Sequence, residues 1–154
     1  MSRETRLIAG GMLDLDAVMS VMEDGFDPAF GEAWSAPQCA GLLPMPGVWL
    51  VLARDEQEVV GFSLARVVAG EAELLLLAVK KKAQRRGTGK LLLERFFKDS
   101  EERGAEKLYL EVRDGNSAVD LYKSLGFTEA GRRSKYYTGS DGQIYDSITL
   151  SKIV

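Results

Sequence analysis

One stretch of the chain limits its possible folds more than any other. Residues 72–79 are almost continuously apolar, and Leu74 to Val79 is an uninterrupted apolar run of six residues, a length that no run in the sequence exceeds. Such a run is far short of the roughly 20 residues that span a bilayer, but it suits a strand covered on both faces. A basic loop containing glycines and a helical pattern over residues 88–103 follow directly. This order predicts an α/β protein built on a central sheet.

The rest of the sequence alternates between helix and strand patterns. Asp14 is a candidate N-cap for an amphipathic helix, and Ser35 is a candidate cap for a second, shorter helix. We expect helices over residues 15–22, 35–43, 88–103 and 118–125. We expect strands over residues 5–9, 48–54, 59–68, 72–79, 108–112, 127–137 and 144–150, with a hairpin loop at 55–58. Since no repeat or linker interrupts the pattern, the sequence predicts one α/β domain over residues 1–154 with a mixed sheet.

Composition narrows the chemistry that is open to the chain. Its 154 residues include no histidine and a single cysteine, Cys39. These counts exclude a Ser-His-Asp triad, a Cys-His pair, histidine-ligated zinc or haem, a multi-cysteine metal site and an internal disulfide. We therefore expect no metal, and chemistry based on carboxylates, tyrosines, lysines, hydroxyls, backbone amides or a cofactor.

The charge pattern predicts a local anion site rather than general affinity for nucleic acid, and the short apolar runs predict no membrane association. Residues 80–107 carry 10 basic and 5 acidic side chains, whereas residues 1–79 carry 4 basic and 12 acidic ones. A basic segment in a protein of net charge −3 indicates a local anion site. Residues 1–4 lack the apolar core of a signal peptide, so we expect a cytoplasmic protein. We also expect the protein to be a monomer or a homodimer.

The basic loop before the helix at 88–103 has the features of an anion-binding helix start. Gly87 and Gly89 permit positive φ angles and close approach of an anion to the backbone, at the positive end of the helix dipole. The loop is not a Walker A loop, because Gln84 and Leu91 replace the required glycine and hydroxyl residue. Leu92 replaces a glycine that the dinucleotide fingerprint requires, so neither nucleotide-binding pattern applies.

The pattern that remains, Gln84-x-x-Gly87-x-Gly89, resembles the acetyl-CoA pyrophosphate loop of the GCN5-related N-acetyltransferase (GNAT) superfamily. Downstream, Leu110-Glu111-Val112-Arg113, then Asn116, then Ala118 to Phe127 resemble the second half of the same signature. The resemblance implies a GNAT-type fold, in which a largely antiparallel mixed sheet of about six to seven strands is flanked by about four helices.

The resemblance also implies roles for single residues. Glu111 is the implied proton acceptor and Tyr122 the implied proton donor. Asn116 lies six residues before Tyr122 here, one fewer than in the family, so this loop is shortened. Acetyl-CoA is the implied cosubstrate, with contacts at Leu77, Ala78, Val79, Gln84, Arg85, Arg86, Gly87, Thr88, Gly89, Lys90 and Asn116.

Three segments are most similar to the ribosomal protein alanine N-acetyltransferases. They are Ala29-Phe30 before Trp34-Ser35, the Leu-Glu-Val-Arg strand, and Arg132-Arg133 with Tyr136-Tyr137 before a turn at 139–142. This likeness implies acetylation of the α-amine of a peptide or protein N-terminus, with a ribosomal protein among the candidate partners. The implied acceptor-binding residues are Trp34, Arg133, Tyr136 and Tyr137.

The residue types present can carry this reaction. A neutral amine attacks a thioester directly, so neither a protein nucleophile nor a histidine is needed. A carboxylate such as Glu111 can deprotonate an alkylammonium, and a tyrosine hydroxyl such as that of Tyr122 can protonate a thiolate. Two alternatives stay open: acetylation of a small amine such as a polyamine, amino acid or aminoglycoside, and a non-catalytic acyl-CoA-binding regulatory module.

Overall fold

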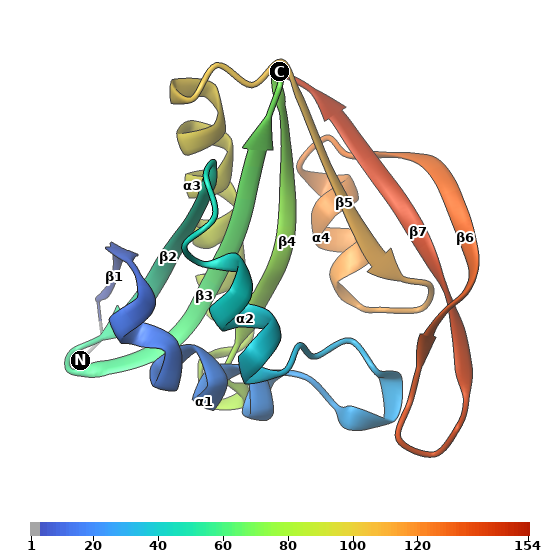
Figure 1. The fold of residues 1–154 in the computed structure, drawn as a ribbon, viewed down its shortest axis with the longest axis horizontal. Helices are drawn as coiled ribbons and strands as arrows, with labels where there is room; N and C mark the ends of the chain where they lie inside the picture. The colour runs from blue at the N-terminus through green and yellow to red at the C-terminus, as the bar shows by residue number, and fades with distance from the viewer. Residues whose placement is uncertain (1–3) are drawn as a thin grey trace.

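The computed structural model describes residues 4–154, and its sheet has seven strands in the order β1-β2-β3-β4-β5-β7-β6 (Figure 1). Every neighbouring pair is antiparallel except β4 and β5, which run parallel. The largely antiparallel mixed sheet expected from the sequence is confirmed. The strands are β1 (Thr5–Gly10), β2 (Val48–Asp55), β3 (Glu58–Val68), β4 (Glu71–Val79), β5 (Lys107–Arg113), β6 (Thr128–Thr138) and β7 (Ile144–Ile153).

Helices cover both faces of the sheet (Figure 1). On one face, Val18 and Met22 of α1 pack against strand residues such as Phe62. On the other face, Leu92 and Phe96 of α3 fill a second core. In both helices the buried residues recur at helical spacing, as an amphipathic helix on a sheet requires. The helices on the first face are α1 (Leu15–Gly25) and α2 (Ala36–Leu42), and those on the second are α3 (Thr88–Glu102) and α4 (Ala118–Ser124).

The sheet opens between β4 and β5. Their backbones pair only from Glu71 to Leu74 of β4, and the two strands then diverge (Figure 1). The register of β4 against β3 skips Leu75 at this same point. A β-bulge of this kind bends a strand and changes the direction of the residues that follow. The edge of β4 that faces β5 therefore has no strand partner over residues 75–79 of the described sheet.

The loop between α1 and α2 is fixed to the β6–β7 hairpin. Within it, a 3₁₀ turn at Pro28–Phe30 accepts a hydrogen bond at Pro28 O from the backbone N–H of Ser140 (3.0 Å). Gly31 has a φ of +69°, and a Cβ there would lie 2.1 Å from the carbonyl oxygen of Thr138. Only glycine fits this close approach. The docking brings the loop beside β6 at the open side of the sheet.

Two local predictions are confirmed in kind but differ in detail. The hairpin at 55–58 has a two-residue loop, since Asp55 pairs with Glu58 in the ladder. Asp55 is held there because Thr5 Oγ1 (2.7 Å) and the Arg86 guanidinium (2.6 Å) donate hydrogen bonds to its buried carboxylate. Asp14 is the N-cap residue of α1, as predicted, but its side chain does not cap that helix and instead accepts a hydrogen bond from the backbone N–H of Gly11 (2.9 Å).

The expectations about a signal segment and about membrane-spanning segments concern different parts of the chain. Residues 1–3, on which the expectation about a signal segment depends, lie outside the described part of the chain. None of the helices in residues 4–154 is long and apolar enough to cross a membrane.

Candidate active site

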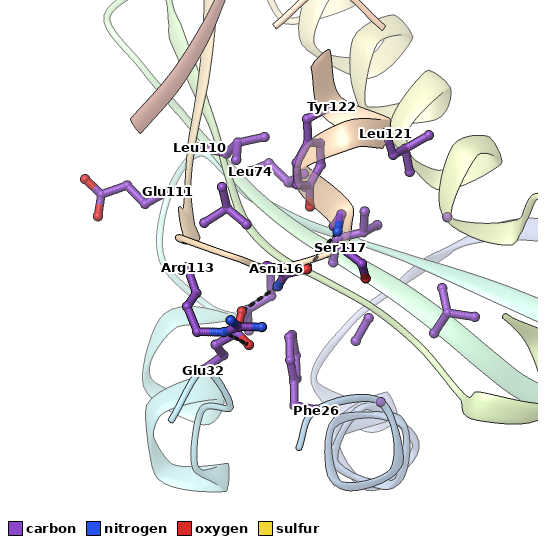
Figure 2. Close-up of a pocket in the computed structure, with 18 of the residues that line it drawn as sticks. Phe26, Glu32, Leu74, Leu110, Glu111, Arg113, Asn116, Ser117, Leu121 and Tyr122 are labelled. Carbon is purple, nitrogen blue, oxygen red and sulfur yellow. Dashed lines mark hydrogen bonds and ion pairs between the residues drawn. The ribbon is translucent and has the colours of Figure 1, made fainter. Parts of the chain in front are cut away.

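A cavity of about 690 Å³ fills the opening between β4 and β5 (Figure 2). The structure gathers most of the residues singled out from the sequence around it. Arg86, Thr88 and Arg133 are the three that lie outside its wall. Those that line it are Trp34, Leu77, Ala78, Val79, Gln84, Arg85, Gly87, Gly89, Lys90, Glu111, Asn116, Tyr122, Tyr136 and Tyr137.

The start of α3 presents backbone amides at one end of the cavity. Gly87 is the N-cap of α3 with a φ of +83°, which glycine adopts without strain. No side chain caps this helix, so the amides of residues 88–90 have no partner within it. Arg85 also has a positive φ, which costs a non-glycine residue about 1–2 kcal/mol. Gln84 stabilises the loop, because its Nε2 donates to Val79 O at 2.9 Å.

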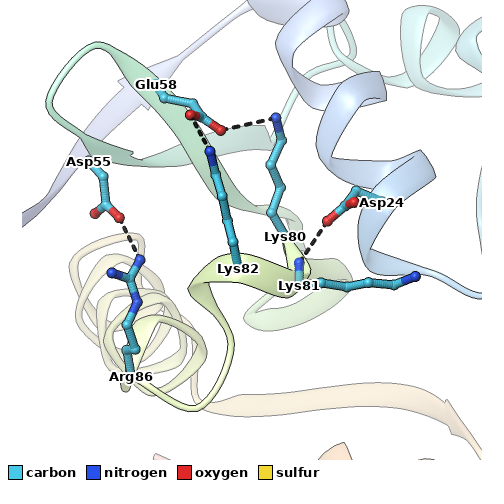
Figure 3. Close-up of polar contacts among 7 residues, drawn as sticks. All are labelled: Asp24, Asp55, Glu58, Lys80, Lys81, Lys82 and Arg86. Atoms are coloured by element: carbon cyan, nitrogen blue, oxygen red, sulfur yellow. Dashed lines mark hydrogen bonds and ion pairs between the residues drawn. The ribbon is translucent and has the colours of Figure 1, made fainter.

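Acidic side chains outside the cavity hold most of the lysine-rich segment (Figure 3). Glu58 on β3 accepts hydrogen bonds from Lys80 Nζ (3.3 Å) and from Lys82 Nζ. Hydrogen bonding to Lys82 lowers the pKa of the Glu58 carboxyl. The backbone N–H of Lys81 donates to Asp24 at the end of α1 (2.7 Å). These contacts anchor the segment, and two of its three ammonium groups are already paired.

Two other cations face the cavity. The Arg86 side chain does not line it and pairs with Asp55 (Figure 3). Arg85 and Lys90 line the cavity and make no ion pair with any residue in 4–154. Arg85 and Lys90 are therefore the basic side chains placed to meet an anion at the start of α3.

Tyr122 of α4 presents a protonated hydroxyl to the cavity (Figure 2). Its ring packs edge-on against Phe127, with centroids 6.0 Å apart. Burial, and secondarily the negative charge of Glu32, raises the pKa of Tyr122 above its ordinary value. The hydroxyl makes no hydrogen bond to another residue of the described chain, so its proton is available to a ligand.

Glu111 borders the opening from the other side of β5. Its neighbours Leu110 and Val112 pack into the core with Tyr122. Because successive strand residues face opposite sides, the Glu111 carboxylate points away from Tyr122 (Figure 2). The carboxylate is 14% exposed and pairs with Arg133 Nε at 2.8 Å. A carboxylate and a phenol thus flank the opening from its two faces.

Aromatic side chains enclose the cavity on the Glu111 side. Tyr136 and Tyr137 of β6 line it, with their rings edge to face and centroids 4.8 Å apart. Burial raises the pKa of Tyr137 to about 12, so its hydroxyl is neutral at physiological pH. Trp34, in the loop before α2, adds a further apolar surface. This wall can hold an uncharged, extended chain next to Glu111.

A polar network in the wall was missed by the sequence analysis. Glu32 accepts hydrogen bonds from Arg113 Nε (3.1 Å) and Asn116 Nδ2 (2.7 Å). The Arg113 guanidinium also lies over the ring of Phe30, 3.7 Å from its centroid. Glu32 is separated from its two partners by 81 and 84 residues, so no local pattern could have revealed the contact.

A family model agrees with this geometry. The model described as "Acetyltransferase (GNAT) family" matches residues 15–127. The chain belongs to the GNAT acetyltransferase family. The match includes the glycine loop at the start of α3, Glu111 and Tyr122, which are the parts of the cavity wall that the sequence signature specified.

Curated GNAT relatives include two enzymes with the same name. [Ribosomal protein bS18]-alanine N-acetyltransferase from Salmonella typhimurium is 44% identical over 94 residues, 60% of this chain and 63% of that protein. The Escherichia coli protein is 44% identical over 83 residues, 53% of this chain and 56% of that protein. The chain thus spans about three fifths of the length of these relatives. N-alpha-acetyltransferase RimI from Mycobacterium tuberculosis is 33% identical over 146 residues, 92% of this chain and 85% of that protein.

Solved structures confirm the GNAT fold. The ribosomal-protein-S18-alanine N-acetyltransferase from Escherichia coli has a TM-score of 0.88 and 32% identity, and covers 98% of this chain and 94% of its own. Arabidopsis thaliana NAA60 in complex with acetyl-CoA has a TM-score of 0.85 and 20% identity, with coverage of 98% and 99%. The second likeness concerns the fold alone.

Proposed function

We propose that this GNAT protein is an acetyl-CoA-dependent N-acetyltransferase that acts on the α-amine of a protein or peptide N-terminus. The observation that carries the proposal is the placement of Glu111 and Tyr122 on opposite faces of the β4–β5 opening. The names of the relatives support the choice of reaction, above all the Mycobacterium tuberculosis protein that aligns over 92% of this chain.

The residues around the cavity fit acetyl-CoA. The amides of 88–90, with Arg85 and Lys90, would hold the pyrophosphate. The unpartnered edge of β4 at residues 77–79 offers backbone donors and acceptors to the amide groups of the pantetheine arm. Arg86 and Thr88 would act through their backbone amides, since the first side chain pairs with Asp55 and the second is buried. When bound, the cosubstrate supplies an acetyl group activated as a thioester.

Glu111 and Tyr122 have complementary roles in the proposed reaction. Glu111 removes a proton from the acceptor ammonium, directly or through one water, and the neutral amine attacks the thioester carbonyl. As the C–N bond forms and the C–S bond breaks, the Tyr122 hydroxyl gives its proton to the departing sulfur, and the surplus proton of the newly acylated nitrogen passes through water to the Tyr122 phenolate and restores the phenol. Since burial keeps Tyr122 protonated at physiological pH, this proton is in place before the reaction begins.

Tyr122→Phe should lower kcat by about 100-fold, because only the donated proton is lost. The affinity for acetyl-CoA should stay within about threefold of wild type. The free energy of unfolding should change by less than about 0.5 kcal/mol, since the hydroxyl bonds no residue of the described chain. Steady-state kinetics, calorimetry and urea unfolding measure the three quantities. A variant with wild-type kcat would contradict the role of Tyr122.

The acceptor in this proposal is a peptide rather than a small amine. Tyr136, Tyr137 and Trp34 form an aromatic wall beside Glu111, suited to stacking against and hydrogen-bonding an extended backbone. The Salmonella and Escherichia coli relatives are named for an alanine of ribosomal protein bS18. We therefore propose that the acceptors are protein N-termini with a small first residue, and that ribosomal proteins are among these proteins. We propose that the reaction takes place in the cytoplasm.

Turnover on a panel of amines tests this choice. Peptides that begin with alanine or serine should be acetylated, whereas spermidine, free amino acids and an aminoglycoside should react at least about 100-fold more slowly in kcat/KM. Tyr137→Ala should raise KM for the alanine peptide by about tenfold and leave acetyl-CoA affinity unchanged, with Tyr137→Phe as the matched control that keeps the ring. Efficient acetylation of polyamines with none of any peptide would contradict the proposal.

A further inference from the structure

The Glu32 side chain, in the cavity wall, joins two segments that lie far from it in the sequence. Its carboxylate is only 11% exposed, and each oxygen accepts one hydrogen bond (Figure 2). Oε1 faces Arg113 Nε at 3.1 Å and Oε2 faces Asn116 Nδ2 at 2.7 Å. The positive charge of Arg113 balances the negative charge of Glu32, and the Arg113 side chain is itself only 10% exposed. A nearly buried carboxylate with both oxygens engaged fixes the relative position of the segments that it joins.

The hydrogen bond to Asn116 connects Glu32 with the start of α4. Asn116 Oδ1 accepts a hydrogen bond from the backbone N–H of Ala118 (2.8 Å), and its carbonyl accepts one from Val119 (3.1 Å). The N-cap residue, Ser117, contributes no side-chain cap. With seven residues, α4 is too short to be stable alone, so its position depends on such end contacts. The helix carries Tyr122, whose pKa responds to the charge of Glu32.

The loop that carries Glu32 is also attached to the strands that form the acceptor wall. This loop is docked on the β6–β7 hairpin through Gly31 and the bond from Ser140 N to Pro28 O. The Arg113 guanidinium lies 3.7 Å from the ring centroid of Phe30 in this loop and 5.6 Å from that of Tyr145 of β7, and the two rings contact each other edge to face. Glu32 therefore connects the wall around the acceptor with the helix that carries the proton donor.

We propose that Glu32 is a positioning residue, which holds the start of α4 and hence the Tyr122 hydroxyl in register with the acceptor wall. Asn116 is the link in this arrangement, since its side-chain amide bonds both Glu32 and the first turn of α4. The role assigned to Glu32 rests on the proposed function, because it matters to catalysis only if Tyr122 donates a proton there.

Single substitutions should break the link, and a double substitution should restore it. In Glu32→Gln, the amide oxygen of the new side chain can still accept a hydrogen bond from Arg113. Its amide nitrogen then faces the Nδ2 donor of Asn116, so the second hydrogen bond is lost. In Asn116→Asp, two carboxylates meet at the distance of a hydrogen bond and repel. Combining the two substitutions reverses the bond, since the new amide at position 32 donates to the new carboxylate at position 116. The second oxygen of that carboxylate can still accept from the Ala118 amide.

Enzyme kinetics and amide hydrogen exchange test the contact between Glu32, Asn116 and α4 independently. Each single variant should lower kcat by about tenfold or more, because small displacements of a catalytic group are costly, and should leave KM for acetyl-CoA within about threefold. Exchange of the Ala118 amide should become about tenfold faster. The double variant should recover both values to within about threefold of wild type. Glu94→Gln, an exposed glutamate on α3, is the matched control and should change neither.

The outcomes separate this inference from the proposed function. Wild-type kcat and wild-type Ala118 exchange in Glu32→Gln would overturn the role of Glu32 while leaving the reaction intact. Two impaired single variants with no recovery in the double would also overturn it, because the reversed hydrogen bond is its specific prediction. If the wild-type protein acetylated no amine, the proposed function would fail, and Ala118 exchange would still decide whether Glu32 holds α4.

Discussion

Gly89→Val should bind acetyl-CoA at least about 100-fold more weakly than the wild-type protein, measured by calorimetry. A Cβ at this position would have Leu121 (3.8 Å) and Val79 (4.0 Å) as its nearest neighbours. Both neighbours line the cavity, so the branched side chain enters the space beside the amides of the first turn of α3. An anion that needs close contact with these amides is then excluded.

The same geometry supplies the controls for Gly89→Val. No backbone atom lies near the new Cβ, and valine is a better helix former than glycine, so the free energy of unfolding should stay within about 1 kcal/mol of wild type. Gly41→Val is the matched substitution, since Gly41 lies in α2 with nothing within 4 Å of its Cβ position. Unchanged acetyl-CoA affinity in folded Gly89→Val would show that the first turn of α3 is not the anion site.

Glu111→Gln should lower kcat at neutral pH by about 100-fold or more while acetyl-CoA affinity stays within about twofold. The amide keeps an oxygen for the hydrogen bond from Arg133, and the ion pair it replaces is partly exposed. The free energy of unfolding should therefore fall by no more than about 1 kcal/mol. Steady-state kinetics and urea unfolding measure these quantities.

The pH dependence of Glu111→Gln distinguishes a lost base from a distorted site. An α-amine has a pKa of about 7.7–8.0, so without a base the rate should follow the neutral fraction of the acceptor. It should rise close to tenfold from about pH 6 to about pH 7 and level off above about pH 8.5. Asp141→Asn, an exposed acidic residue in the β6–β7 turn, is the control for a general charge effect. Wild-type turnover in Glu111→Gln at neutral pH would rule out Glu111 as the base.

The parts of the site that depend on local sequence could be predicted. The loop from Gln84 to Gly89 lies between a buried strand and an amphipathic helix, and each of these two elements has a distinct pattern within its own residues. Strand alternation placed Glu111 opposite Leu110, and helical spacing buried Leu92 and Phe96. In each case a short-range rule of backbone geometry decides the outcome.

The rest depends on contacts between distant segments, which no local rule encodes. Glu58 draws Lys80 and Lys82 away from the role in phosphate attraction that a basic loop suggests. Arg133, expected in the peptide groove, pairs with Glu111. Charge counting cannot assign these partners, because the pairing depends on how neighbouring strands align in the folded sheet.

The mass-spectrometric position of the acetyl group tests the proposed N-terminal acetylation most directly. The substrate is a peptide with an N-terminal alanine and an internal lysine, incubated with acetyl-CoA beside the same peptide with a blocked N-terminus. We predict one acetyl group on the alanine nitrogen of the first peptide and none on the second. Acetylation of the lysine in both peptides, or of neither peptide while spermidine is acetylated, would contradict the proposal.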